Sequence, residues 1–312
     1  MSRAARGAAK PRAAFALDSA LVARQAAFER YFARVLPAPG TLPSRLHDAM
    51  RYGALAPGKR VRPLLALTAC EAVGGSWRDA LPAAAALECV HAFSLIHDDL
   101  PAMDDDDYRR GRLTTHKKYG EALGLLAGDA LIALAFEELV RLGGRGVSPA
   151  RVSEAVRVLA RASGSRELIA GQVLDLAAER RTGRRPDAAR VRDIHERKTG
   201  ALIAAALQLG VIAGGADTHT QRRFARLGRT LGLAFQIHDD LLNRGSTLAK
   251  LGKRAGTDEA RGKATWPAAV GEEYARRDCE RLFASARGTI ERMGPPARRL
   301  VALVDAVARR ER

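Results

Sequence analysis

The sequence predicts an all-α protein that folds as a single domain, and three observations lead to this fold class. Ala, Leu, Arg and Glu dominate the chain, and runs of β-branched residues are rare, a composition that favours helix. Apolar residues recur at helical spacing in one segment after another. The turn-forming stretches between these segments are all too short to link two domains.

The expected helices follow one another along the chain, and each is bounded by Gly- and Pro-containing stretches. The helices are expected over six ranges: 81–97, 121–141, 151–162, 188–213, 221–243 and 277–292. The bounding stretches are 36–43 (LPAPGTLP), 73–79 (VGGSWRD), 142–149 (LGGRGVSP), 181–187 (RTGRRPD), 213–219 (AGGADTH) and 294–296 (GPP).

The two ends of the chain differ in character. Residues 1–24 are expected to form a basic, disordered tail, and residues 25–312 to form the single domain. The opening MSRAARGAAKPRAAF is not followed by an apolar core and a cleavage site, which argues against a targeting peptide. The polar stretch 244–263 is the only long candidate for a mobile loop, and such a loop beside a site is often a lid.

The net charge of +17 raises the question of a polyanionic partner. Aromatic residues make up only 5%, and no basic stretch is interleaved with stacking residues, so we expect no nucleic acid. No apolar run of about 18 residues is present, so we expect no membrane span. The three cysteines are widely spaced and fit buried thiols in a reducing compartment, which predicts a cytoplasmic protein.

The chemistry is concentrated in two acidic clusters. The pentapeptide Ile-His-Asp-Asp-Leu occurs at 96–100 and again at 237–241, each time at the end of an apolar run. Adjacent carboxylates near a core are costly unless a cation neutralises them, so we expect both clusters to face one cavity. Oxygen ligands without Cys or paired His favour Mg²⁺, which bridges carboxylates to phosphate oxygens. Either cluster alone could be an exposed helix end, but two together make that reading weak.

The spacing within each cluster indicates how the carboxylates converge. Asp98 and Asp104 are six residues apart, which on an ideal helix places them on different faces. Pro101 cannot continue the hydrogen-bond ladder, and extrusion of two residues there would return Asp104 to the i+4 position. The second cluster places four polar residues on one stripe of a helix: Gln236, Asp239, Asp240 and Asn243.

Four segments, in order, resemble the polyprenyl synthetase family. The stretch 91–131 (HAFSLIHDDLPAMDDDDYRRG and onward) is similar to its first aspartate-rich region, in the bacterial short-chain farnesyl form. The other three segments are PGKRVRP at 57–63, ERKTGALI at 196–203, and LGLAFQIHDDLLN with LGKRAGTDEARGKATWP at 231–267. The resemblance covers roughly residues 25–290. It implies an isoprenoid synthase type of helical bundle around a deep central cavity, active as a homodimer.

The same resemblance implies an activity and its cofactor. The expected reaction joins isopentenyl diphosphate to dimethylallyl or geranyl diphosphate, and gives farnesyl diphosphate with the help of three Mg²⁺ ions. The resemblance also implies roles for individual residues. The metal ligands would be Asp98, Asp104 and Asp239. The isopentenyl diphosphate contacts would be Lys59, Arg62, His91 and Arg110. The contacts of the allylic substrate would be Arg109, Lys198, Thr199, Gln236 and Lys253.

These roles agree with the chemistry. Ionising an allylic carbon–oxygen bond requires the charge of the leaving diphosphate to be neutralised. The residues expected to act in that step are Asp98, Asp104, Arg109, Lys198, Asp239 and Lys253. Phe93 lies five residues before Asp98, and the resemblance implies that it is the floor that stops elongation at fifteen carbons.

Several alternatives remain open at this stage. Phe93 could be one more core aromatic, Lys198-Thr199-Gly200 a helix irregularity, and the pair Lys59 and Arg62 an ordinary basic turn. His97 is expected to be a core histidine outside the site, and Asp106 and Asp107 to be solvated.

Two positions depart from the family pattern. Asn243 replaces a usual third aspartate, and Pro57 replaces a usual Gly. The alternative functions are a geranylgeranyl diphosphate synthase of the same family, a class I terpene synthase-like protein and a non-catalytic partner protein.

Overall fold

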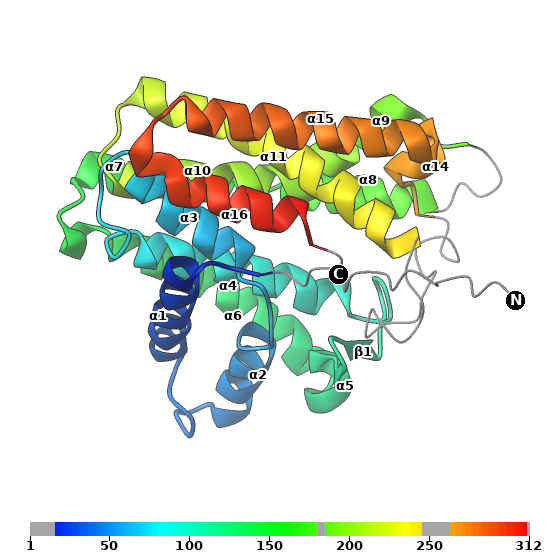
Figure 1. Cartoon of the computed structure of the whole chain (residues 1–312). Coiled ribbons are helices and arrows are strands. Elements are labelled where there is room, and N and C mark those ends of the chain that lie inside the picture. The colour runs from blue at the N-terminus through cyan, green and yellow to red at the C-terminus, as the bar shows by residue number, and fades with distance from the viewer. Residues whose placement is uncertain (1–15, 180–184, 245–262, 311–312) are drawn as a thin grey trace, which may run out of the picture.

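The computed structural model describes residues 16–179, 185–244 and 263–310, and within these ranges the predicted all-α fold is confirmed. Figure 1 shows the helices in chain order. The first half contains α1 (Ser19–Val35), α2 (Ser44–Ala54), α3 (Val61–Ala72), α4 (Leu81–Asp98), β1 (Tyr108–Arg109), β2 (Arg112–Leu113), α5 (Thr115–Tyr119), α6 (Glu121–Val140) and α7 (Pro149–Ser163). The second half contains α8 (Leu168–Glu179), α9 (Ala188–His195), the π-helical segment η2 (Glu196–Gly200), α10 (Ala201–Ala213), α11 (Thr218–Arg244), α14 (Trp266–Val270), α15 (Glu272–Glu291) and α16 (Arg298–Ala308).

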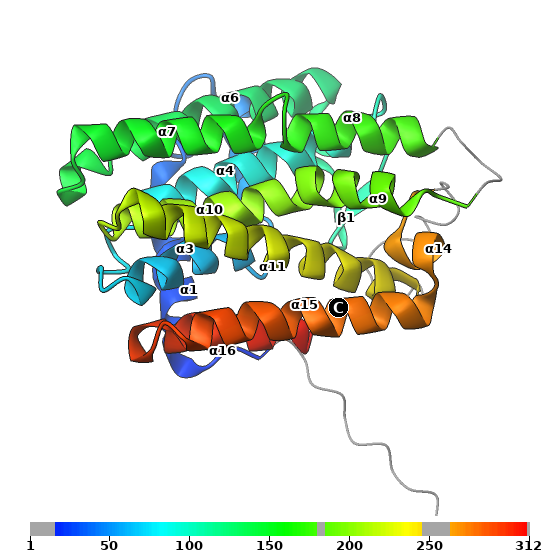
Figure 2. The ribbon, with the colours of Figure 1, turned by 90° about the horizontal axis from the view of Figure 1, so that it is seen from above.

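The helices pack in layers around two that are apolar on every side. Nearly every residue of α4 from Leu81 to Phe93 is buried, and so are most residues of α10. A helix that is hydrophobic all round belongs inside a fold. Figure 2 shows α4, α10 and α11 between α7 and α8 on one side and α15 and α16 on the other.

Glycines let α11 approach η2 closely. A Cβ built on Gly232 would lie 2.5 Å from the Cα of Gly200, a distance that real Cβ atoms do not show. The side chain of Gln236, one turn further along α11, is thereby brought within hydrogen-bond reach of Thr199 in η2.

The predicted boundary of the N-terminal tail is wrong. Helix α1 begins at Ser19, and the Asp18 side chain caps it by accepting a hydrogen bond from the Leu21 N–H at 2.7 Å. Leu21 is fully buried, and Arg24 pairs with Glu71 of α3. The fold therefore includes residues that the sequence assigned to the tail.

Two further expectations differ from the structure. The helix expected over 188–213 is interrupted by η2, because one turn there widens to the π-helical form. Part of the loop expected over 244–263 is structured: Arg244 ends α11, and 263–265 lead into α14, while 245–262 lie outside the described residues. Among the described residues, no helix combines the length and apolar character that crossing a membrane requires.

Candidate active site

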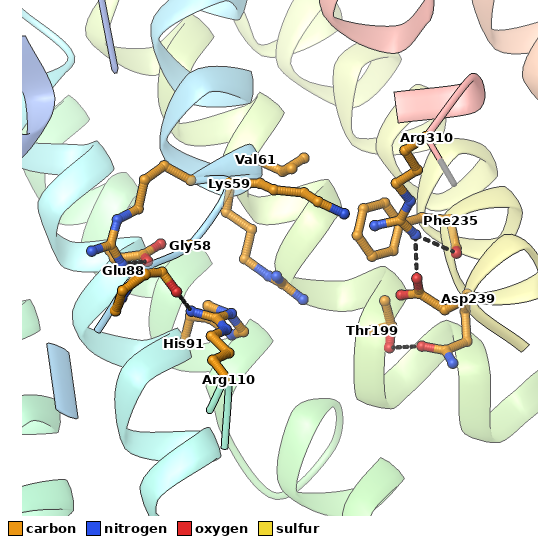
Figure 3. Close-up of a pocket in the computed structure, with 14 residues that line it drawn as sticks. Gly58, Lys59, Val61, Glu88, His91, Arg110, Thr199, Phe235, Asp239 and Arg310 are labelled. Carbon is orange, nitrogen blue, oxygen red and sulfur yellow. Dashed lines mark hydrogen bonds and ion pairs between the residues drawn. The ribbon is translucent and has the colours of Figure 1, made fainter. Parts of the chain in front are cut away.

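A cavity of about 500 Å³ lies between the start of α3, the middle of α4, segment η2 and the second half of α11 (Figure 3). Seven residues predicted for the site line this cavity: Lys59, Arg62, His91, Arg110, Thr199, Gln236 and Asp239. Four further lining residues carry charge or an aromatic ring and were not predicted: Arg60, Glu88, Phe235 and Arg310. The cavity thus brings together segments that lie far apart in the sequence.

The turn before α3 directs its basic side chains in different directions. Arg60 takes a left-handed conformation (φ 51°) and is 5% exposed. Its guanidinium donates to Glu29 at 2.7 Å and to Glu88 at 2.6 Å. All three basic residues (Lys59, Arg60 and Arg62) line the cavity, but the charge of Arg60 is neutralised by Glu29 and Glu88 within the fold.

Arg62 is a buried cation that lacks a full set of partners. Its Nε is buried and has no hydrogen-bond partner in the part of the chain that the structure describes. Burial lowers the pKa of Arg62, although the charges of Glu88 and Asp239 oppose the shift. Unsatisfied buried donors are rare in native proteins, and one in a cavity wall indicates a place for an anion.

His91 lies beside this cation. Burial lowers the pKa of His91 well below 6.5, and the nearby Arg62, Arg110 and Arg109 lower it further. The ring is therefore neutral at neutral pH and has one N–H to donate. An anion bound here would raise the pKa, because it would favour the charged ring.

A short hairpin, which the sequence analysis missed, positions the two adjacent arginines. Strands β1 and β2 pair Arg109 with Arg112, and the turn contains Arg110 (φ 53°) and Gly111 (φ 75°). Two consecutive left-handed residues are typical of tight hairpin turns, and the Gly is the signal that could have predicted it. Arg110 donates to the carbonyl oxygen of Pro57 at 2.6 Å, next to the cavity, and Arg109 donates to Asp99 at 2.7 Å.

The first acidic cluster converges, but not by the predicted route. Helix α4 ends at Asp98 and does not resume after Pro101. The chain instead turns back, so that the Asp104 N–H donates to the Asp98 carbonyl oxygen at 2.8 Å. Extrusion of two residues within a continuing helix is therefore wrong, because α4 has already ended at Asp98, before Pro101.

Cations surround this pair of aspartates. Burial raises the pKa of the Asp98 carboxyl, Lys198 opposes the shift, and Asp104 adds to it. The Lys263 ammonium lies 3.3 Å from a carboxylate oxygen of Asp104. Asp107 pairs with Lys117 and is exposed, as expected, whereas Asp106 is half-buried.

The second cluster divides between two tasks. Asp239 lines the cavity and pairs with Arg310. Asp240 is buried and accepts hydrogen bonds from the Trp266 N–H at 2.8 Å and from Gln236 at 3.0 Å. The first carboxylate lies at the cavity in an ion pair, whereas the second holds α14 against α11.

Segment η2 places Lys198 and Thr199 on the site. The Thr199 hydroxyl donates to Gln236 at 2.6 Å, and the Lys198 ammonium donates to Asp175 of α8 at 2.7 Å. Single π-helical turns within helices occur frequently at functional sites, so this irregularity is compatible with the predicted role of the two residues. Asp175 was not predicted. Gly171, one turn earlier in α8, lets the two segments approach: an added Cβ there would lie 2.6 Å from the Lys198 Cα.

Five of the described residues predicted for the site do not line this cavity: Asp98, Asp104, Arg109, Lys198 and Phe93. Phe93 is 6% exposed, and its ring meets the His97 ring edge-on at 5.7 Å. His97 in turn makes a hydrogen bond with the Leu125 carbonyl oxygen at 2.9 Å, in keeping with its exclusion from the site. Lys253 lies outside the described residues.

Comparison with known proteins decides the family. The family described as Polyprenyl synthetase matches residues 43–290. The chain belongs to the polyprenyl synthetase family. The resemblance found in the sequence is thereby confirmed, and with it the helical isoprenoid synthase fold.

Three relatives illustrate the similarity to other polyprenyl synthetases. Geranylgeranyl pyrophosphate synthase 9, chloroplastic, of Arabidopsis thaliana is 45% identical over 267 residues, which are 85% of this chain and 74% of that protein. An FPP/GFPP synthase from Zymomonas mobilis superposes with a TM-score of 0.81 at 36% identity, covering 93% of this chain and 98% of that one. A geranyltransferase from Helicobacter pylori complexed with magnesium and isoprenyl diphosphate gives 0.81 at 28% identity, covering 92% and 96%.

The relatives do not confirm the expected farnesyl product. The relatives compared by sequence are mostly named geranylgeranyl pyrophosphate synthases, including one from Capsicum annuum that is 44% identical. These names fit the alternative product, twenty carbons long, better than the main expectation of fifteen.

Proposed function

We propose that this polyprenyl synthetase transfers an allylic prenyl group to isopentenyl diphosphate and releases inorganic diphosphate. One observation carries the proposal: a cavity whose basic wall, Lys59, Arg62, His91 and Arg110, faces the carboxylate of Asp239. The basic wall suits a diphosphate because it presents several N–H donors, one of them the unsatisfied Nε of Arg62. Both substrates are anions, so the basic wall would bind a diphosphate directly, and the carboxylate would bind one through Mg²⁺.

The carboxylates suit Mg²⁺ bound together with a diphosphate. No three His, Cys, Asp or Glu side chains among the described residues converge closely enough to hold a metal by themselves. Mg²⁺ commonly takes only one or two protein carboxylates and completes its shell with water and substrate phosphate. Asp98 and Asp104 would hold it from one side and Asp239 from the other, with three ions in all, as the resemblance implies. The Helicobacter relative, whose structure contains magnesium, supports this choice of metal.

The chain's own residues would bind and position the reactants. The carbon–oxygen bond of the allylic diphosphate would break, and Mg²⁺ held by Asp98, Asp104 and Asp239 would supply positive charge to the departing diphosphate. Lys198 and Arg109 add positive charge beside Asp98. The double bond of isopentenyl diphosphate, held on the basic wall, supplies the electrons of the new carbon–carbon bond. Attack leaves a tertiary cation on the isopentenyl unit, and a proton would leave the carbon beside that cation for an oxygen of the departing diphosphate, so no protein nucleophile is required.

The length of the product is proposed from Phe93. Its position on α4, five residues before Asp98, is about 7.5 Å along the helix from the metal ligands. An aromatic side chain at this depth favours farnesyl diphosphate, because its volume would stop the growing chain. Geranylgeranyl diphosphate is the second candidate, and the names of the relatives favour it.

The homodimer implied by the resemblance is also part of the proposal. Exposed apolar side chains recur along one side of α6: Leu125, Leu126 and Val140, which are 47%, 50% and 63% exposed. A second copy of the chain packed on this side would remove them from water. The sedimentation coefficient of the full chain tests this state.

The cytoplasm remains the proposed compartment. Cys70, Cys89 and Cys279 are free and buried. Burial raises the thiol pKa of Cys70 and of Cys279 to about 12, so these groups are unreactive structural thiols. The chloroplastic location in their names belongs to the plant relatives.

Incorporation of radiolabelled isopentenyl diphosphate into an acid-labile prenyl product tests the activity. We expect incorporation only when an allylic diphosphate and Mg²⁺ are both present, because both halves of the cavity must be filled. Consumption of the allylic diphosphate alone, with no label incorporated, would indicate a terpene synthase. No consumption of either substrate would indicate a non-catalytic partner.

A further inference from the structure

Arg310 holds an unusual position for a residue near the end of a chain. It follows the end of α16, yet only 5% of it is exposed. Its guanidinium carbon lies 3.9 Å from the centre of the Phe235 ring. Its Nη2 donates to the Asp239 carboxylate and, at 3.4 Å, to the Phe235 carbonyl oxygen (Figure 3). The side chain therefore reaches into the cavity from an element that the family motifs in the sequence do not include.

The partner of Arg310 is the carboxylate that the proposed function assigns to a metal ion. A guanidinium and a divalent cation compete for one carboxylate, because each needs its lone pairs and the two positive charges repel each other. Arg310 thus supplies the positive charge that Asp239 requires in this half-buried position.

The opposite acidic wall shows the same arrangement. The Lys263 ammonium lies 3.3 Å from Asp104 and 3.7 Å from Glu179. A candidate metal ligand on each wall is therefore paired with a cation from the last fifth of the chain. Basic side chains therefore neutralise a carboxylate on both sides of the site, Asp104 on one side and Asp239 on the other.

The contacts of Arg310 are suited to exchange. Its Nε is buried and has no hydrogen-bond partner among the residues that the structure describes. The backbone N–H of Arg310 donates to the Val307 carbonyl oxygen of α16 at 3.4 Å, and this bond does not depend on where the Arg310 side chain lies. If the Arg310 side chain leaves Asp239, it loses the ion pair with Asp239 and the contact with the Phe235 ring. A divalent cation would then replace Arg310 as the positive charge beside Asp239.

We propose that Arg310 is a resident counter-ion of Asp239 that a divalent metal displaces, so that metal binding and the position of the Arg310 side chain are coupled. The inference rests on the proposed function, which makes Asp239 a metal ligand. An ion that must displace a bound competitor has a lower apparent affinity, which equals its intrinsic affinity multiplied by the fraction of molecules from which the competitor is absent. Removing Arg310 should therefore tighten metal binding.

The test is a titration of the full-length protein with Mn²⁺, followed by the electron paramagnetic resonance signal of the free ion, without diphosphate. Arg310→Met keeps an unbranched side chain against Phe235 but removes the charge, and Arg310→Gln serves as a second variant. We expect either variant to bind Mn²⁺ about tenfold more tightly than the natural protein, the size of effect that loss of a charge-assisted hydrogen bond commonly has. Arg309→Met is the matched control, because the neighbouring Arg309 is exposed and carries the same charge.

A double-mutant cycle locates the effect. In an Asp239→Asn background, Arg310→Met should leave the Mn²⁺ affinity unchanged, because the competition has been removed. Unchanged or weaker Mn²⁺ binding in both Arg310 variants would overturn the inference, and so would an equal gain in Arg309→Met. The proposed function fails separately, since its failure is an absence of prenyl transfer in the natural protein.

Discussion

Asp98→Asn is expected to lower the rate of prenyl transfer by about a hundredfold or more, the usual cost of losing a charge-stabilising element of a transition state. Asp98 ends α4 beside Asp104, and its carboxylate would hold the metal that neutralises the leaving diphosphate. Asparagine is isosteric with aspartate but cannot carry the negative charge. The measurement is the steady-state rate with isopentenyl and allylic diphosphates, and Asp239→Asn should give the same order of loss.

Asp107→Asn is the matched control. Asp107 belongs to the same acidic cluster, but it is exposed and pairs with Lys117 at 2.7 Å. Its replacement should leave the rate near that of the natural protein, because exposed ion pairs contribute little. Helical circular dichroism should be unchanged in all three variants. A natural rate in Asp98→Asn would disprove the assignment of the acidic cluster.

Phe93→Ala is expected to change both product and stability. The buried ring contacts His97, so its removal leaves a void that costs about 3–5 kcal/mol of unfolding free energy. Where the ring is also the floor of the prenyl chain, the product lengthens to twenty carbons or more. Chromatography of the dephosphorylated products, together with denaturant unfolding, separates the two effects.

Phe28→Ala provides the comparison for Phe93. Phe28 is fully buried in α1, where it stacks on Phe32 at 5.4 Å between ring centres. Its removal should cost a similar unfolding free energy and leave the product unchanged. A product of unaltered length from Phe93→Ala would show that another residue sets chain length. A natural product of twenty carbons would favour the alternative that the named relatives suggest.

The sequence predicted the helices that have a regular apolar periodicity and the site residues that belong to recognisable motifs. Helices α4, α6 and α11 lie where the apolar spacing placed them, because burial on one or all sides leaves that pattern. The start of α1 was missed because Ala and Arg dominate residues 1–24, and only the Asp18 cap marks the boundary. Similarly, the interruption at η2 leaves no mark in apolar spacing, since Lys198 and Thr199 are compatible with either helical form.

The sequence predicted site residues that lie close together along the chain, and it did not predict pairs of residues that are far apart along the chain. Asp98, His91 and Arg110 fall within one continuous motif, and His91 and Asp98 lie on the same helix, α4. Arg310 lies 71 residues from Asp239, and nothing near Arg310 distinguishes it from the many other arginines. Asp175 likewise meets Lys198 across 23 residues. Such pairings depend on how the helices pack against one another, and no short stretch of sequence indicates that packing.

The proposed function divides the cavity into one half that binds a diphosphate only with Mg²⁺ and one half that binds a diphosphate without it. Equilibrium binding of radiolabelled isopentenyl diphosphate and of a non-ionisable allylic diphosphate, each with Mg²⁺ and with a chelator, tests this division directly. The basic wall (Lys59, Arg62, His91 and Arg110) should bind isopentenyl diphosphate with or without the metal. The allylic analogue should bind with Mg²⁺ and lose its affinity in the chelator, because Asp98, Asp104 and Asp239 would then repel its charge. Allylic binding that persists unchanged in the chelator would contradict this division.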